Sequence, residues 1–112
     1  MKNLNMYCIT IDEGHLDLIK RLGYLPVGLG KNIKSKDFIR DNTNINISKK
    51  NPFYGEYTFH YWLWKNRMDN LENKWIGFCQ YRKFWTTKRS ERDLKDFDYF
   101  TKLLLKKIPD EY

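Results

Sequence analysis

Arg82 and Lys83 are the residues best suited by type and spacing to bind an anion. They follow an apolar stretch and are flanked by aromatic residues in Gln80-Tyr-Arg-Lys-Phe-Trp85. Two cations at the end of a strand can bind a diphosphate while a neighbouring ring stacks on a base or a sugar. The same charges would also keep an exposed strand edge soluble. The pattern therefore leaves a phosphate site and a solvated edge equally open.

A second stretch is dense in aromatic residues: seven of the twelve residues from position 53 to 64 are Phe, Tyr or Trp. Tyr57, Tyr61 and Trp64 recur at spacings of four and three, which predicts one packed face of a helix. Core packing does not account for the polar residues at the two ends, Glu56 and Lys65-Asn66. The helix dipole offers a structural explanation for Glu56, because a carboxylate is favoured in the first turn of a helix.

Gly28-Leu-Gly30-Lys31 follows a predicted strand and could bring backbone amides close to a phosphate, with Lys31 adding charge. The third glycine of a dinucleotide fingerprint and the Lys-Ser/Thr pair of a Walker loop are both missing. By itself the motif is as well explained by a tight turn.

A metal site is not supported by the sequence. Asp96-Phe-Asp98 has the Asp-X-Asp form with which sugar transferases hold a divalent metal, but it falls inside a predicted helix, where that motif does not belong. Cys8, Cys79, His15 and His60 contain no ligand pair at zinc-site spacing. No cofactor is evident, and a divalent metal stays open without support from the sequence.

Composition indicates one small, basic, folded domain. The chain has 112 residues, a net charge of +7 and 17% aromatic residues, which fits one domain and argues against disorder. No apolar run is long enough for a membrane span, the amino terminus does not resemble a secretory signal, and two isolated cysteines favour a reducing compartment. We expect a cytoplasmic protein, either free or peripheral at the inner membrane surface.

The positive charge concentrates late in the chain and predicts an anionic partner. Arg82, Lys83, Lys88, Arg89 and Arg92 are opposed only by Glu91. Such a cluster suits a nucleic acid, a nucleotide diphosphate or an acidic membrane face.

The order of predicted elements is that of a parallel α/β sheet with crossover helices. We predict strands at 5–10, 24–29 and 75–81, the last one buried; helices after Asp12, from 54 or 55 to 68, and from a Ser90/Asp93 capping box to Ile108; and a polar loop at about 30–52. Ligands bind at the carboxyl ends of such strands, so we expect function at 11–14, 30–36 and 82–85.

Several blocks of the chain, spread over about residues 5–85, resemble one family of capsular and exopolysaccharide glycosyltransferases, long known only as a domain of unknown function. The blocks are Asn46-Ile-Ser48, Lys50-Asn-Pro52, Glu56-Tyr-Thr58, Tyr61-Trp-Leu-Trp-Lys-Asn66 and Ile76-Gly-Phe-Cys-Gln-Tyr-Arg-Lys-Phe84.

The resemblance implies a GT-A-like fold and transfer of a sugar from a nucleotide-diphosphate donor to a glycan acceptor. The positions that match its motifs, and so are expected to bind the donor, are Asn46, Ser48, Asn51, Glu56, Lys65, Asn66, Tyr81, Arg82 and Lys83. We expect the cations to meet the Asn/Ser loop in one cavity and to stabilise the departing nucleoside diphosphate.

The chain departs from the family pattern at Gln80, where the family has His, and at Lys83, where it has Arg. Residues 1–112 are expected to be a single, partial domain of about half the family's extent, without the acceptor-binding half. Two alternatives therefore stay open: a non-catalytic basic module that binds nucleic acid or nucleotide, of which nucleic acid is the less favoured ligand, and an inactive shortened copy. A half-domain could also self-associate through an exposed sheet edge.

Overall fold

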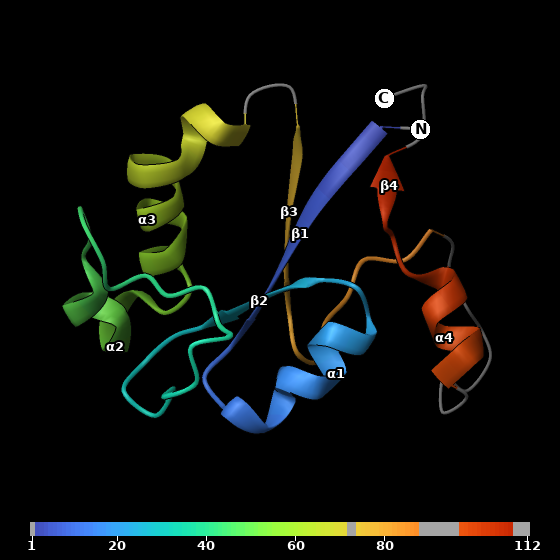
Figure 1. Cartoon of the computed structure of the whole chain (residues 1–112), viewed down its shortest axis with the longest axis horizontal. Coiled ribbons are helices and arrows are strands. Elements are labelled where there is room, and N and C mark those ends of the chain that lie inside the picture. Colours follow the sequence, from blue (N-terminus) through green and yellow to red (C-terminus); the bar gives the residue numbers. More distant parts are fainter. Residues whose placement is uncertain (1, 72–73, 88–96, 109–112) are drawn as a thin grey trace.

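The central element of the fold is β1 (Lys2–Thr10), which pairs in parallel with β2 (Leu25–Gly28) on one side and β3 (Trp75–Gln80) on the other. The computed structural model describes residues 2–71, 74–87 and 97–108 (Figure 1). Helices lie between the parallel strands along the chain. The predicted α/β class with a parallel sheet is confirmed.

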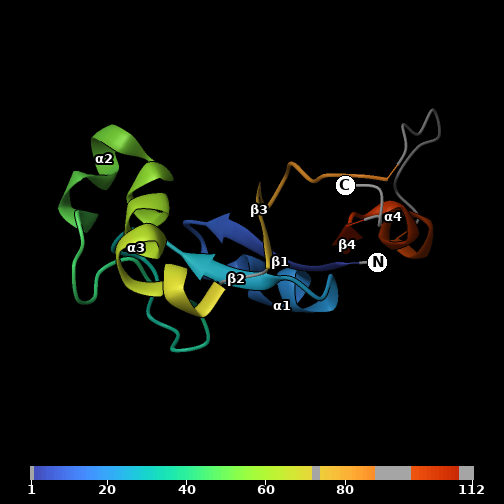
Figure 2. The ribbon, with the colours of Figure 1, turned by 90° about the horizontal axis from the view of Figure 1, so that it is seen from above.

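Alternation along β1 divides the core into two layers, because successive strand residues point to opposite faces of a sheet. Tyr7 and Ile9 pack against α3 (Tyr57–Arg67), whereas Met6 and Cys8 face α1 (Leu16–Arg21) and α4 (Phe97–Leu103). Figure 2 shows α3 at one side of the strands and α4 at the other. The sheet therefore lies between two helical layers.

The two cysteines are direct neighbours in the sheet. Cys8 lies opposite Cys79 in the register of β1 and β3, and both are buried free thiols. The hydrogen bond to Cys8 and burial raise the pKa of the Cys79 thiol well above its usual range. Both side chains thus behave as small core residues.

The turn after β1 forms as its sequence predicts. Asp12 caps the short helix Glu13–His15, and its Oδ1 accepts a hydrogen bond from the Gly14 amide at 2.8 Å. α1 follows, and Gly23 ends it with φ of 76°.

Two elements differ from the predictions. β3 is not a buried strand, since only Cys79 of its six residues is buried; among the described strands it pairs with β1 alone and so forms an edge. The predicted helix does not reach Ile108, which lies in β4 (Lys107–Ile108), antiparallel to the start of β1. The chain leaves α4 because the Leu105 amide bonds to the Trp85 carbonyl at 2.9 Å. Ser90 and Asp93 lie outside the described residues.

The prediction of which face of α3 packs against the core is also wrong. Tyr57 and Trp64 point to solvent, with 65% and 59% of their surface exposed, and the core face of the helix instead carries Phe59, Trp62 and Leu63. Aromatic residues occupy both faces of this helix, so spacing alone does not tell which face meets the sheet.

The long polar loop is shorter than predicted, because its last residues form a 3-10 turn (Ser48–Lys50) and α2 (Asn51–Tyr54). Its middle is held beside β2: the Ile39 amide donates to the Pro26 carbonyl at 2.9 Å and the Gly28 amide donates to the Ile39 carbonyl at 3.0 Å. The loop therefore extends the sheet edge.

Gly28 allows this close approach, and we predict that Gly28→Ala is destabilising. A Cβ at this position would lie 2.8 Å from Ile33 Cγ2 and 2.9 Å from Phe38 Cγ, atoms near the backbone that cannot easily move. We expect the free energy of unfolding in urea to fall by about 1–3 kcal/mol. Gly77→Ala is the matched control, since the close contacts of its Cβ, at 2.8 Å, are with the flexible end of Met6, and Leu4 Cδ1 lies at an ordinary 3.4 Å. An equal loss in both variants would contradict this explanation.

Candidate functional site

A cavity of about 520 Å³ opens at the carboxyl ends of β1 and β2, where a parallel sheet is expected to bind ligands. We call it the β1–β2 cavity. It is lined by Ile11, Leu29, Gly30, Lys31, Asn32, Arg40, Asp41, Asn42, Ser48, Lys49, Asn51 and Pro52. Two exposed lysines thus share its wall with carboxylate, amide and hydroxyl groups.

Asp41 is the buried carboxylate of this wall, with 2% of its surface exposed. The Thr58 hydroxyl, which is wholly buried, donates to Asp41 Oδ2 at 2.5 Å. Asn51 Nδ2 in turn donates to Thr58 Oγ1 at 3.2 Å and to the Gly55 carbonyl at 2.9 Å. This network joins the polar loop to the first turn of α3. It also supplies the hydrogen-bond donor that a buried carboxylate needs.

Arg40 fixes the glycine turn on the other side of the cavity. Its two terminal nitrogens donate to the carbonyls of Gly28 and Gly30, both at 2.7 Å. Glu13 holds the next part of the loop by accepting from the backbone amides of Lys34 and Ser35. With its guanidinium engaged in this way, Arg40 acts as a brace for the loop.

A second cavity, of about 310 Å³, lies at the end of β3 and is called the β3 cavity. It is lined by Glu56, Phe78, Cys79, Gln80, Lys83, Phe84 and Trp85. Gln80 Nε2 donates to Glu56 Oε2 at 3.2 Å, and Trp85 Nε1 donates to the Phe78 carbonyl at 2.8 Å. Aromatic rings here lie beside one carboxylate and one ammonium group.

Tyr81 and Arg82 belong to a stack that joins β1 to β3. The Tyr81 ring lies on the His15 ring with centroids 4.1 Å apart, and the Arg82 guanidinium lies 4.9 Å from the Tyr81 centroid. His15 Nδ1 is 2.7 Å from the hydroxyl of Thr10, the last residue of β1. Arg82 is therefore held near the carboxyl ends of both strands.

The side chains of Asn46 and Asn66 are hydrogen-bonded to other parts of the chain and so help to hold the polar loop. Asn46 Oδ1 accepts from the amide and the hydroxyl of Ser48, at 3.2 and 3.0 Å. Asn66 bonds to both backbone groups of Ile45 and so ties the loop to the end of α3. Lys65 lies over the exposed Trp64 ring, 4.0 Å from its centroid.

Four of the nine residues predicted to bind the donor line two different cavities, and the other five line neither. Ser48 and Asn51 line the β1–β2 cavity, and Asn46 is hydrogen-bonded to Ser48, whereas Glu56 and Lys83 line the β3 cavity. The expectation of one shared cavity is not met. The turn after α2 connects the two, since Asn51 bonds to Gly55 and Glu56 follows directly.

Sequence reasoning missed Arg40, Asp41 and Lys49. They lie in or beside the polar loop, where no periodicity marks one charged residue among many. The only sequence feature that could have pointed to them is that charged residues occur in a loop too long to be a simple connection.

Residues 8–109 match the family described as Domain of unknown function (DUF4422). The chain belongs to this family. No curated protein and no solved structure matches it. The matched residues therefore include the lining of both cavities, all of β2 and β3, and the last three residues of β1.

In the described part of this DUF4422 chain, no three His, Cys, Asp or Glu side chains gather as a metal site would require. Asp96 lies outside the described residues, and Asp98 lies in the first turn of α4.

His60 of the DUF4422 chain is a half-buried ring beside the β3 cavity. It lies 4.1 Å from the Phe78 ring, and its Nε2 is buried without a hydrogen-bond partner among the described residues. Burial lowers the pKa of His60 below its usual value of 6.5, and Glu56 opposes this in part. The ring is therefore held in its neutral form.

We predict that Thr58→Val weakens the DUF4422 fold by about 1–3 kcal/mol, because Asp41 loses its buried donor. Urea unfolding measures the change. Thr58→Ser keeps the hydroxyl and should retain most of the stability, and Thr86→Val, at an exposed position, should change it little. Equal losses in the Val and Ser variants at position 58 would show that the hydroxyl contributes nothing.

We also predict that His60 makes the fold sensitive to acid. The unfolded chain takes up a proton at His60 at higher pH than the folded chain, because the folded pKa is lowered. The free energy of unfolding should therefore fall as the pH drops below about 6.5 and through the folded pKa. Urea titrations between about pH 7 and pH 5 should show a shallower fall in His60→Gln and His60→Phe. Unchanged slopes in both variants would exclude this origin.

Proposed function

We propose that this DUF4422 chain forms the donor-binding part of a glycosyltransferase that uses a nucleotide-diphosphate sugar in capsule or exopolysaccharide synthesis. The observation that carries the proposal is the β1–β2 cavity: two lysines and a buried carboxylate meet at the carboxyl ends of parallel strands. The sequence resemblance to capsular glycosyltransferases supplies the reaction class.

In this proposal the β1–β2 cavity holds the nucleoside diphosphate. Lys31 and Lys49 neutralise the phosphate oxygens. Asp41 accepts hydrogen bonds from hydroxyls of the ribose, since a carboxylate is an acceptor only. The hydroxyl of Ser48 and the amide of Asn51 line the same wall. The Thr58 contact keeps Asp41 oriented before the donor arrives.

The β3 cavity then receives the sugar of the donor and the attacking hydroxyl of the acceptor. The faces of Phe84 and Trp85 offer apolar surface against which a sugar ring can pack, and Glu56 offers an acceptor for a hydroxyl proton. Lys83 and Arg82 supply positive charge for the departing diphosphate. Gln80, hydrogen-bonded to Glu56, orients the carboxylate and carries no proton itself.

We further propose that the enzyme works in the cytoplasm at the inner membrane surface, where a growing surface polysaccharide would be assembled. No helix among the described residues has the length and apolar character to cross a membrane.

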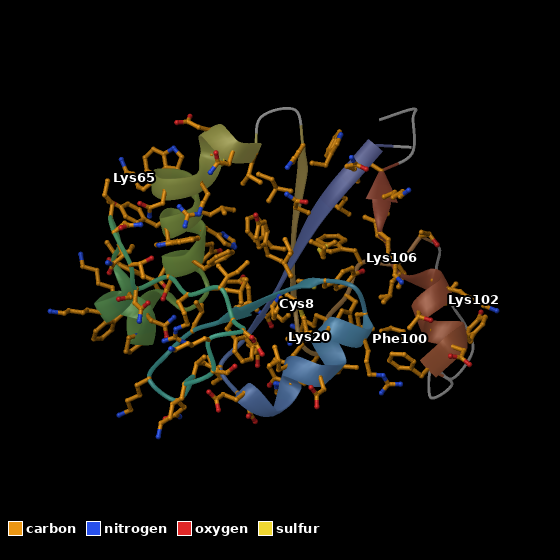
Figure 3. The ribbon with its side chains drawn as sticks, viewed as in Figure 1. Cys8, Lys20, Lys65, Phe100, Lys102 and Lys106 are labelled. Carbon is orange, nitrogen blue, oxygen red and sulfur yellow. The ribbon has the colours of Figure 1, made fainter. Side chains whose placement is uncertain are left out.

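Titration calorimetry with uridine, cytidine and guanosine diphosphates tests the donor site. We expect one of the three to bind, and Lys31→Ala and Lys49→Ala each to weaken it about tenfold. Lys102→Ala is the control, because this exposed lysine lies on α4 (Figure 3). Arg82→Ala should weaken binding by about 1–3 kcal/mol if the diphosphate reaches the end of β3.

Three outcomes would change the interpretation. Failure of all three nucleotides to bind would remove the donor site. Equal effects of the Lys31 and Lys102 variants would reduce it to nonspecific charge. Steep salt-dependent binding of single-stranded RNA, without a nucleotide response, would instead favour a nucleic-acid module.

A further inference from the structure

Helix α3 carries apolar residues on two opposite faces. At 100° per residue, Phe59, Trp62 and Leu63 cluster on the side that packs on the sheet. Tyr57, Tyr61, Trp64 and Met68, at spacings of four, three and four, fall on the other side. A helix that is apolar all round is normally covered all round. The outer side of α3 therefore lacks a cover among the described residues.

This outer stripe, defined as Tyr57, Tyr61, Trp64 and Met68, is exposed along its whole length except at Tyr61, which is half-buried. Tyr61 and Trp64 contact each other edge to face, with ring centroids 5.9 Å apart. Next to the stripe, α2 adds Phe53, the most exposed large apolar residue described, at 86%. Figures 1 and 2 both show α2 beside α3 at the same end of the molecule.

Positive charge accompanies these rings. Lys65 lies over both Tyr61 and Trp64, with Nζ 5.9 and 4.0 Å from their centroids, and points away from the sheet in Figure 3. On the neighbouring α2, Lys50 Nζ lies 6.0 Å from the centroid of the exposed Tyr54 ring. The stripe is thus aromatic at its centre, with a positive border formed by Lys65 and, on the neighbouring α2, by Lys50.

We propose that the outer stripe of α3, with Phe53 and Lys65, docks on an anionic lipid surface. Trp and Tyr prefer the boundary between headgroups and acyl chains, because each ring has an apolar body and a polar end. Lysines beside them attract anionic headgroups while their methylene chains cover apolar surface. The positive border favours this occupant over a second copy of the same chain, which would bring like charges together.

The inference rests on the proposed location at the inner membrane surface and is independent of the proposed sugar transfer. The outer stripe contains no residue of either cavity. Nucleotide binding and lipid binding can therefore fail separately.

Co-sedimentation with vesicles tests the proposal. We expect the chain to bind vesicles of phosphatidylcholine mixed with phosphatidylglycerol, to bind pure phosphatidylcholine much less, and to be released by high salt. Trp64→Ala and Lys65→Glu should each lower the partition coefficient about tenfold.

Matched controls come from other surfaces of the chain. Trp85→Ala removes an indole of similar exposure at the β3 cavity, and Lys102→Glu reverses a charge on α4, at the opposite end of the molecule from Lys65 in Figure 3. Both controls should sediment like the parent chain. Circular dichroism confirms that each variant is folded.

Two results would overturn the proposal. One is equal sedimentation with neutral and anionic vesicles, or equal loss in Lys65→Glu and Lys102→Glu. The other is a concentration-dependent dimer, detected by light scattering without lipid and dissolved by Trp64→Ala, together with no vesicle binding. That result would assign the stripe to a second copy.

Discussion

The buried hydrogen bond from Thr58 to Asp41 is the constraint on which the candidate site depends. A carboxylate that is almost fully buried has to be hydrogen-bonded, and its donor here belongs to the first turn of α3. The polar loop is therefore fixed to a helix that is itself packed on the sheet. Asn51 extends the link to Gly55, directly before Glu56, which lines the β3 cavity. A loop with little secondary structure thus becomes a defined surface.

The two cavities are related through the strands that end beside them. Thr10 ends β1 and contacts His15, on which the Tyr81 ring stacks just after β3. These contacts hold the carboxyl ends of β1 and β3 close together. The Arg82 guanidinium lies against the Tyr81 ring at the same place. In a transferase of the proposed kind, this arrangement would bring a donor in one cavity next to an acceptor in the other.

Helix α3 combines three tasks that normally fall to separate elements. Its inner face completes the core, its first turn holds Asp41, and its outer stripe is available to a partner. This explains the density of aromatic residues between positions 53 and 64, which is more than a core face alone requires. The same density misled the sequence interpretation, because both faces follow helical spacing.

The sequence by itself determined the strand–helix order, the parallel sheet and the Asp12 cap, because these follow from local periodicity and from capping side chains close in the chain. It also marked Ser48, Asn51, Glu56 and Lys83 by type, and the family match runs through them. Only the tertiary structure decided which face of α3 is buried, that β3 is an edge, that Ile108 is in a strand, and that the marked residues fall into two cavities. Those outcomes depend on contacts between residues far apart in the chain, and no local pattern encodes such contacts.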